Sequence, residues 1–129
     1  MGLVMTPAAL RALATRVETE EPADALNEDV ARALDGWWWD SGEAEWVSDE
    51  GCTTQELPDY LTDLTAAASG MPDGPMGVAG RTGGRWEAWW FFSDIWLGIR
   101  REEALADTEA AVRVALRLRA LAAKIEAEA

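Results

Sequence analysis

The pattern of apolar and polar positions predicts two helices near the start of the chain. The first begins at Thr6-Pro7, because a hydroxyl residue followed by proline is a favourable helix start. The second begins at Glu21-Pro22 and ends at Gly36, since glycine is the usual residue beyond a helix C-terminus. The apolar residues at helical spacing are Leu10, Leu13, Ala14 and Val17 in the first helix and Leu26, Val30, Ala33 and Leu34 in the second.

Two later segments repeat this helical spacing. One begins at Leu57-Pro58 and stops at Gly70. The other is the remainder of the chain from Glu102 to Ala129, a long helix that is entered at Asp107-Thr108. The apolar stripes are Leu57, Leu61, Leu64 and Ala68 in the third helix and Val112, Ala115, Leu116, Leu118, Leu121, Ala122 and Ile125 in the last.

Alternating apolar residues and turn signals predict strands in two regions. Each region has a hairpin, and residues 48–56 between them are expected to be a loop. The predicted strands are 37–39 and 44–47, around a turn at 40–42, then 76–81 and 85–92, around a turn at 82–84, and finally 95–100, after a turn at 93–94.

The strand at 85–92 is aromatic on both faces. Trp86 and Trp90 point one way, and Trp89 and Phe91 point the other way. Two apolar faces need cover on both sides, so we expect an α+β fold in which a mostly antiparallel sheet is sandwiched between helices, an α/β/α sandwich with a long C-terminal helix. A length of 129 residues fits one domain, residues 1–129.

The chain is strongly acidic, with a formal net charge of −13. Residues 1–75 hold 16 acidic and 3 basic side chains, whereas residues 76–129 hold 8 of each. Such a charge disfavours direct binding to nucleic acid or to an anionic membrane. The single cysteine, Cys52, and the lack of a signal pattern or a spanning apolar run favour the cytoplasm.

Three segments resemble a known family. They are "PADALNEDVARAL" leading into tryptophans, "LPDYLTDLTAAASGMPDG" before further Trp-containing strands, and the terminal "DTEAAVRVALRLRALAAK". In this layout the chain resembles the small phage and prophage proteins grouped as the phage ABA-sandwich domain family. The resemblance implies a sheet between helices and a place in the cytoplasm of an infected bacterial host. It implies no catalytic residues.

The residues argue against an enzyme. The chain has no histidine, which removes the commonest general base and the commonest metal ligand. One cysteine cannot build a thiolate zinc site, and "GVAGRTGGR" lacks the lysine and hydroxyl of a nucleotide-hydrolase loop. We therefore expect no catalytic residues, no metal site and no cofactor.

Eight tryptophans in one small domain need an explanation. We assign Trp37, Trp39, Trp86 and Trp90 to the core. The other indoles, beside arginines, are typical of a site where a flat ligand stacks and guanidinium groups hold its phosphate. The predicted ligand-binding residues are Trp38, Trp46, Arg81, Arg85, Trp89, Trp96, Arg100 and Arg101. The arginines could instead solvate sheet edges and pair with Glu102 and Glu103.

These residues lead to two functional hypotheses. The first is a non-catalytic phage accessory protein for counter-defence, which binds and sequesters a small anionic nucleotide-type signalling molecule and forms a homo-oligomer. The alternative is an acidic DNA mimic, or a protein–protein inhibitor of a host defence enzyme, that uses the acids of residues 18–63. A virion or assembly component without a ligand is a third possibility.

Overall fold

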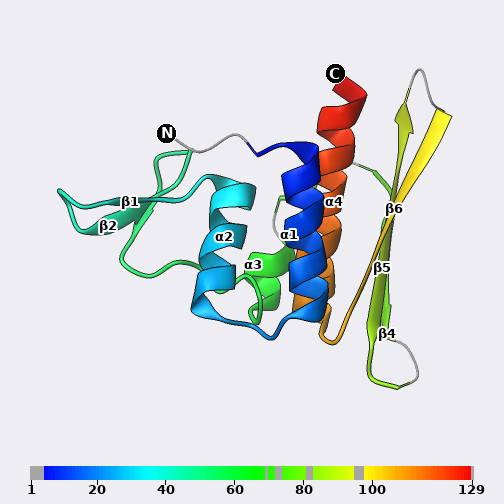
Figure 1. Cartoon of the computed structure of the whole chain (residues 1–129), viewed down its shortest axis with the longest axis horizontal. Helices are drawn as coiled ribbons and strands as arrows, with labels where there is room; N and C mark the ends of the chain where they lie inside the picture. Colours follow the sequence, from blue (N-terminus) through cyan, green and yellow to red (C-terminus); the bar gives the residue numbers. More distant parts are fainter. Residues whose placement is uncertain (1–4, 69, 72–73, 81–82, 95–97, 129) are drawn as a thin grey trace.

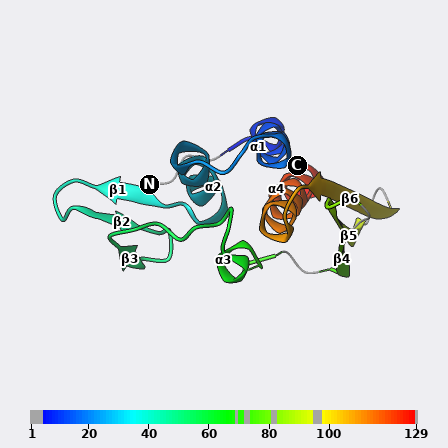
Figure 2. The ribbon, with the colours of Figure 1, turned by 90° about the horizontal axis from the view of Figure 1, so that it is seen from below.

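The computed structural model describes residues 5–68, 70–71, 74–80, 83–94 and 98–128 (Figure 1). In chain order the elements are α1 (Pro7–Thr19), α2 (Asp24–Asp35), β1 (Trp38–Asp40), β2 (Glu45–Val47), β3 (Thr53–Thr54), α3 (Leu64–Ala68), β4 (Met76–Gly80), β5 (Trp86–Asp94), β6 (Gly98–Ala106) and α4 (Glu109–Glu128). The strands form two antiparallel three-stranded sheets, β1-β2-β3 and β4-β5-β6. The helices lie between the two sheets (Figures 1 and 2).

The caps of the first two helices follow the predicted local signals. Thr6 Oγ1 accepts a hydrogen bond from the Ala9 N–H at 3.1 Å, and proline occupies the first turn of α1. Gly36 adopts a φ of 65°, and its N–H donates to the Arg32 carbonyl at the end of α2. α2 begins at Asp24, slightly later than predicted, because Ala23 is extended.

The core is built around α4. Thr108 Oγ1 accepts from the Ala111 N–H at 3.1 Å, so α4 begins just after the predicted Asp107-Thr108 entrance. α4 packs against α1 and against β5 and β6. Its fully buried side chains include Val112, Val114, Leu116 and Leu118. Residues 102–106 belong to β6, so the prediction that the helical segment starts at Glu102 is wrong.

β5 is the central strand of the larger sheet. Its predicted inward alternation is confirmed: Ala88 and Trp90 are fully buried, and Trp90 stacks on Phe92 with 4.6 Å between ring centroids. The predicted turn at 93–94 is wrong, because β5 continues to Asp94 and Ser93 pairs with Ile99 of β6. Residues 95–97 of the predicted strand lie outside the described residues.

The layer order differs from the predicted α/β/α sandwich. The α+β class, the antiparallel pairing and the long C-terminal helix are as predicted, but the helices form the middle layer. No described helix covers the side of β4-β5-β6 that faces away from α4 (Figure 1). The Trp89 ring on that side lies instead over its own sheet: a Cβ at Gly77 would stand 2.2 Å from it.

The helix predicted from Leu57 is confirmed only at its end. α3 covers Leu64–Ala68, while residues 57–63 form a turn-containing segment. Asn27 on α2 provides the physical reason, since its side chain accepts from the Tyr60 N–H and donates to the Pro58 carbonyl, both at 2.9 Å. These tertiary hydrogen bonds replace the helical ones. The predicted loop at 48–56 also contains the short strand β3.

The four tryptophans that were assigned to the core differ in solvent exposure. Trp37 is 8% exposed and Trp90 is fully buried, as predicted, and Trp86 is half-buried against the core. Trp39 is 46% exposed, so its assignment is wrong. The hairpin β1–β2 extends away from the helices (Figure 1), which leaves alternate residues of β1 without a core to face. No helix in the described ranges is long and apolar enough to cross a membrane.

Candidate functional site

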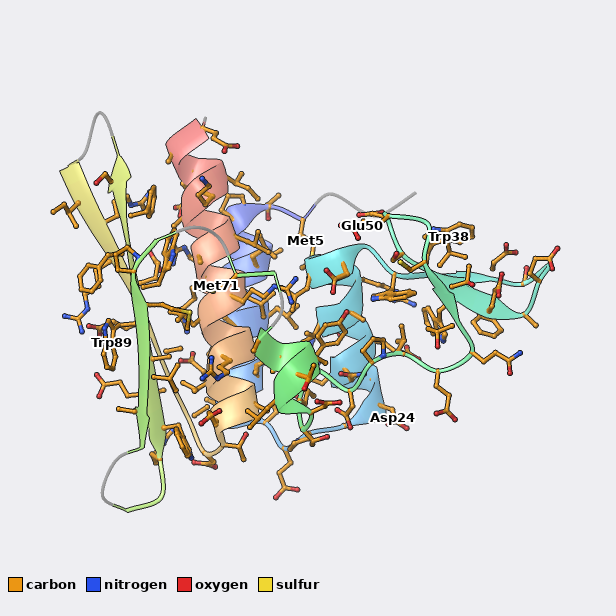
Figure 3. All side chains as sticks on the ribbon, turned by 180° about the vertical axis from the view of Figure 1, so that it is seen from behind. Met5, Asp24, Trp38, Glu50, Met71 and Trp89 are labelled. Atoms are coloured by element: carbon orange, nitrogen blue, oxygen red, sulfur yellow. The ribbon has the colours of Figure 1, made fainter. Side chains whose placement is uncertain are left out.

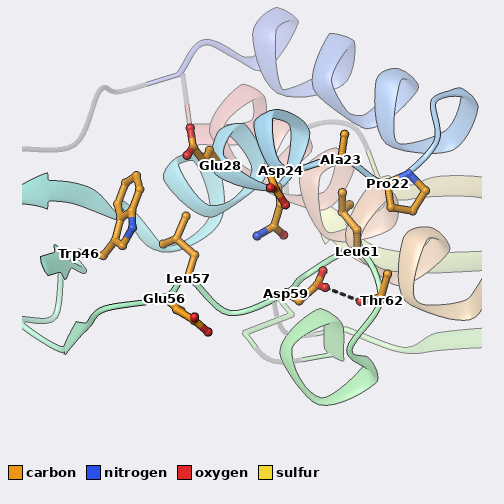
Figure 4. A pocket seen from close by; sticks show the side chains of 11 residues that line it. Pro22, Ala23, Asp24, Glu28, Trp46, Glu56, Leu57, Asp59, Leu61 and Thr62 are labelled. Atoms are coloured by element: carbon orange, nitrogen blue, oxygen red, sulfur yellow. Dashed lines mark hydrogen bonds between the residues drawn. The ribbon is translucent and has the colours of Figure 1, made fainter.

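A cavity of about 620 Å³ lies between α2, β2 and the segment 56–62 (Figure 4). Asn27 ties this segment to α2 through its two hydrogen bonds and itself lines the cavity. Leu57 and Leu61 contribute apolar wall, and Trp46 contributes its indole from β2. We call this space the Trp46 cavity.

The Trp46 cavity is acidic. Four of its lining residues are carboxylates and none is basic: Asp24, Glu28, Glu56 and Asp59. Asp24 and Glu28 stand four residues apart on α2, which places them on one face of the helix. Asp59 accepts a hydrogen bond from Thr62 Oγ1 at 2.5 Å (Figure 4). Within the described ranges none of the four carboxylates forms an ion pair.

The Trp46 ring already contacts a cation. The Arg32 guanidinium carbon lies 5.9 Å from the ring centroid, within the range of a cation–π contact. Trp39 meets the ring edge-on, with 5.4 Å between centroids and an interplanar angle of 67°. A cavity lined by an indole and four carboxylates attracts positive charge, so its chemistry suits an amine or a guanidinium.

A second cavity, of about 470 Å³, lies where α2, α3, α4 and the segment 48–52 approach one another. Arg117 of α4 lines it with a side chain only 4% exposed, and its Nη2 donates to Asp35 Oδ1 at 3.1 Å. Asp35 Oδ2 accepts from the Tyr60 hydroxyl at 2.5 Å, and that hydroxyl accepts from Trp37 Nε1 at 2.9 Å. Arg117 Nε and Nη1 have no hydrogen-bond partner in the described part of the chain.

This network keeps Tyr60 neutral. Burial raises the pKa of Tyr60 well above its ordinary value, and the hydrogen bond to the Asp35 carboxylate raises it further. The hydroxyl therefore stays a donor to Asp35 at neutral pH. Asp35, Asp49 and Glu50 also line this second cavity, so its acidic groups outnumber Arg117.

The third candidate is the uncovered side of β5 and β6, which we call the outer face. Trp89 and Phe91 of β5 lie there opposite Glu103 and Arg101 of β6. The Arg101 guanidinium stands 5.4 Å from the Phe91 ring centroid and pairs with Glu103 at 2.7 Å. Figure 3 shows Trp89 on the side of the sheet away from the helices.

The predicted ligand-binding residues do not form a single site. Trp38 and Trp46 belong to the sheet β1-β2-β3, whereas Arg85, Trp89 and the later arginines belong to β4-β5-β6 or its edge. The two sheets lie on opposite sides of the helices (Figure 2). Arg81 and Trp96 lie outside the described residues. The prediction grouped these side chains by type, and the fold separates them.

The described arginines of this group are paired with carboxylates. Arg85 lies 3.5 Å from Asp107, and its Nη2 also donates to the Leu105 carbonyl. Arg100 turns to the inner side of the sheet, where it lies over Phe92 and 3.7 Å from Glu126. Arg101 pairs with Glu103, one of the two partners that the alternative interpretation of the arginines named. A phosphate group would have to compete with these carboxylates.

Sequence reasoning named Trp46 but missed the charged residues that line the two cavities. The spacing of Asp24 and Glu28 on one helical face was a usable signal for the first cavity. Arg117 gave a weaker signal, as a charged residue inside the apolar band of the last helix. Among the described residues, no group of three or more acidic or cysteine side chains is arranged to hold a metal ion.

Comparisons with known proteins do not assign the chain to a family. No family model, no curated protein and no solved structure matches the chain. The resemblance to phage sandwich proteins therefore stays a prediction, and the function has to be inferred from the site itself.

Proposed function

We propose that this chain is a non-catalytic acidic binding protein that takes basic side chains of a partner protein into the Trp46 cavity. This is the protein–protein form of the inhibitor hypothesis. If the predicted phage origin holds, a host defence enzyme with a basic surface is the kind of partner it would inhibit. Four carboxylates that line the same cavity as an indole, without ion pairs in the described ranges, carry the proposal.

The distribution of ion pairs supports this choice. Other acids of residues 18–63 are occupied: Glu18 pairs with Arg119, Asp29 with Arg16, and Asp35 with Arg117. The cavity carboxylates have no such partner in the part of the chain that the structure describes. The excess negative charge of the chain therefore includes a concave patch that a lysine or arginine side chain could neutralise. Arg32 already contacts this ring, so a partner's cation would gain a cation–π contact of about 0.5–2 kcal/mol only on the ring face that Arg32 does not cover.

A basic peptide tests the proposal directly. Calorimetric titration with an arginine-rich peptide should show binding that weakens as salt is raised. A variant with Asp24→Asn, Glu28→Gln, Glu56→Gln and Asp59→Asn should lose most of this binding. The matched control removes the same number of charges elsewhere, through Glu21→Gln, Glu43→Gln, Glu45→Gln and Glu50→Gln, and should bind nearly as wild type. Equal loss in both variants would show that only net charge matters and would refute the cavity.

The nucleotide hypothesis is the second candidate, and one observation favours it. Arg101 stands over Phe91 beside Trp89 on the outer face, which offers a ring for stacking and a guanidinium for phosphate. The competing Arg101–Glu103 pair is about half exposed and is worth at most about 1 kcal/mol, so a phosphate could displace Glu103. Calorimetry with cyclic nucleotides and ADP-ribose derivatives tests it. No heat at about 100 µM, roughly −5.5 kcal/mol of binding, would reject it.

A further inference from the structure

The register of β5 and β6 arranges the residues of the outer face in two halves of similar chemistry. Reading outward residues along β5 gives Glu87, Trp89, Phe91 and Ser93, and their partners on β6 are Leu105, Glu103, Arg101 and Ile99. The Trp90–Glu102 pair lies at the middle of this set, with four of the eight residues on each side of it along the strands. Residues at equal distances from this middle correspond: the aromatic Trp89 to Phe91, the aliphatic Leu105 to Ile99, the charged Glu103 to Arg101, and Glu87 to Ser93.

We propose that the outer face joins two copies of the chain in a symmetric face-to-face dimer. A twofold axis that runs across the strands, over the Trp90–Glu102 pair, would place Trp89 of one copy on Phe91 of the second copy. It would also place Arg101 against Glu103, and each contact would occur twice, as an isologous interface requires. The sheets would pack with their strands nearly aligned, as in a β-sandwich, about 10 Å apart.

The same twofold rotation also brings together the residues that lie farthest from the axis. Ile99, which is 76% exposed, would meet Leu105 of the second copy. Glu87 would meet Ser93, so no two like charges would face each other. Aromatic residues at the centre with charged residues beside them are typical of a protein interface.

Charge explains why a second copy should choose this face. A chain of net charge −13 repels its own copies over most of its surface. The outer face carries only Glu87, Arg101 and Glu103 as charged groups among the described residues of β4, β5 and β6 that point outward. These three groups sum to a net charge of only −1, and under the twofold axis Arg101 of each copy would pair with Glu103 of the other.

This inference goes beyond the proposed function and does not depend on it. The Trp46 cavity lies on the other side of the helices from β4-β5-β6 (Figures 1 and 4), so the dimer would present two cavities at its far ends. The contact covers Trp89 and Arg101, and a nucleotide stacking there would have to compete with the second copy.

Charge reversal tests the geometry. Sedimentation equilibrium of the wild-type protein at about 100 µM should show a dimer. Arg101→Glu would set the new carboxylate against Glu103 of the other copy twice over, and Glu103→Arg would set two arginines against each other, so each single variant should be monomeric. The double variant R101E/E103R restores opposite charges and should again be a dimer. Circular dichroism and unfolding midpoints should show that both single variants are folded, because the pair that they break is exposed.

Mixing the two single variants tests the twofold arrangement most directly. Equal amounts of R101E and E103R should form a heterodimer, since one copy then offers two acids and the other two arginines. A wild-type monomer at this concentration would overturn the proposal. Single variants that stay dimeric would also overturn it, because the interface would then lie elsewhere. A mixture that stays monomeric would rule out the twofold arrangement.

Discussion

Arg117 and Asp35 are 82 positions apart in the chain, yet Nη2 of one lies 3.1 Å from Oδ1 of the other. The pair is asymmetric, because the arginine side chain is 4% exposed whereas the aspartate side chain is 36% exposed. Asp35 can use water as a substitute partner, but Arg117 cannot. The cost of breaking the pair should therefore depend on which residue is removed.

Asp35→Asn should destabilise the protein more than Arg117→Met. The first change leaves a buried guanidinium without its counter-ion, and we expect a loss of about 2 kcal/mol, below the roughly 3–5 kcal/mol of fully buried pairs because Asp35 is partly exposed. The second removes a cation with two unsatisfied nitrogens, so we expect a loss within about 1 kcal/mol. Denaturant unfolding of both variants and of the double variant measures this order. The reverse order would contradict it.

Tyr60 should make the protein lose stability at high pH. Its pKa in the folded chain is raised above the unfolded value of about 10, because the ring is buried and its hydroxyl donates to Asp35. The unfolded chain therefore releases this proton first, and the stabilisation that is complete below pH ~10 is lost as pH rises toward the folded pKa. The free energy of unfolding should fall by up to about 1.4 kcal/mol per pH unit.

Tyr60→Phe is the control for this pH dependence. It removes the only tyrosine of the chain, so the difference between the two pH profiles isolates one group. In the wild type, ultraviolet difference absorbance should show the tyrosinate appearing only when the protein unfolds. Profiles that fall equally steeply above pH ~10 would show that other groups cause the loss.

The parts of the fold that the sequence predicted are those with local causes. Thr6-Pro7 and Gly36 act on backbone groups within a turn of themselves, so they mark the ends of α1 and α2 without knowledge of the rest. Residues 57–63 fail as a helix because Asn27, far away in sequence, holds Pro58 and Tyr60. Such a contact leaves no trace in the local spacing.

Glu102 illustrates the same limit inside β6. The sequence predicts that the last helical segment begins at Glu102, whereas Glu102 occupies an inward position of β6. In the structure Glu102 is 9% exposed because Arg11 of α1 donates to both of its carboxylate oxygens, at 2.7 and 3.3 Å. These bonds, together with one to Glu126, raise the pKa of Arg11.

The candidate site was only partly accessible to sequence reasoning. Trp46 was named as a ligand-binding residue, and it does line a cavity. The described arginines of the predicted group, Arg85, Arg100 and Arg101, lie in or beside the other sheet, and the residues that share the cavity with Trp46 include four carboxylates instead. The path of residues 56–62 determines which side chains share the cavity with Trp46. The hydrogen bonds of Asn27 to Pro58 and Tyr60 hold that path in place.

The tryptophans should differ sharply in their contribution to stability. Trp90→Ala should cost about 3–5 kcal/mol, because the side chain is fully buried and stacks on Phe92. Trp39→Ala should cost about 1 kcal/mol or less, since the residue is 46% exposed and its main contact is edge-on with Trp46. Chemical denaturation of both variants gives the comparison. Equal costs would mean that the hairpin β1–β2 is packed against the core.

Fluorescence quenching should identify Trp39 as a major solvent-accessible indole. A neutral quencher such as acrylamide reaches exposed rings and spares buried ones, so the wild type should show an accessible and a protected fraction. Trp39→Phe should reduce the accessible fraction, because this ring is 46% exposed. Trp37→Phe is the matched control: Trp37 is two residues away but 8% exposed, with its Nε1 bonded to the Tyr60 hydroxyl. That control should leave the accessible fraction unchanged, and a reduction by Trp37→Phe alone would contradict the prediction, because Trp37 and not Trp39 would then be the accessible ring.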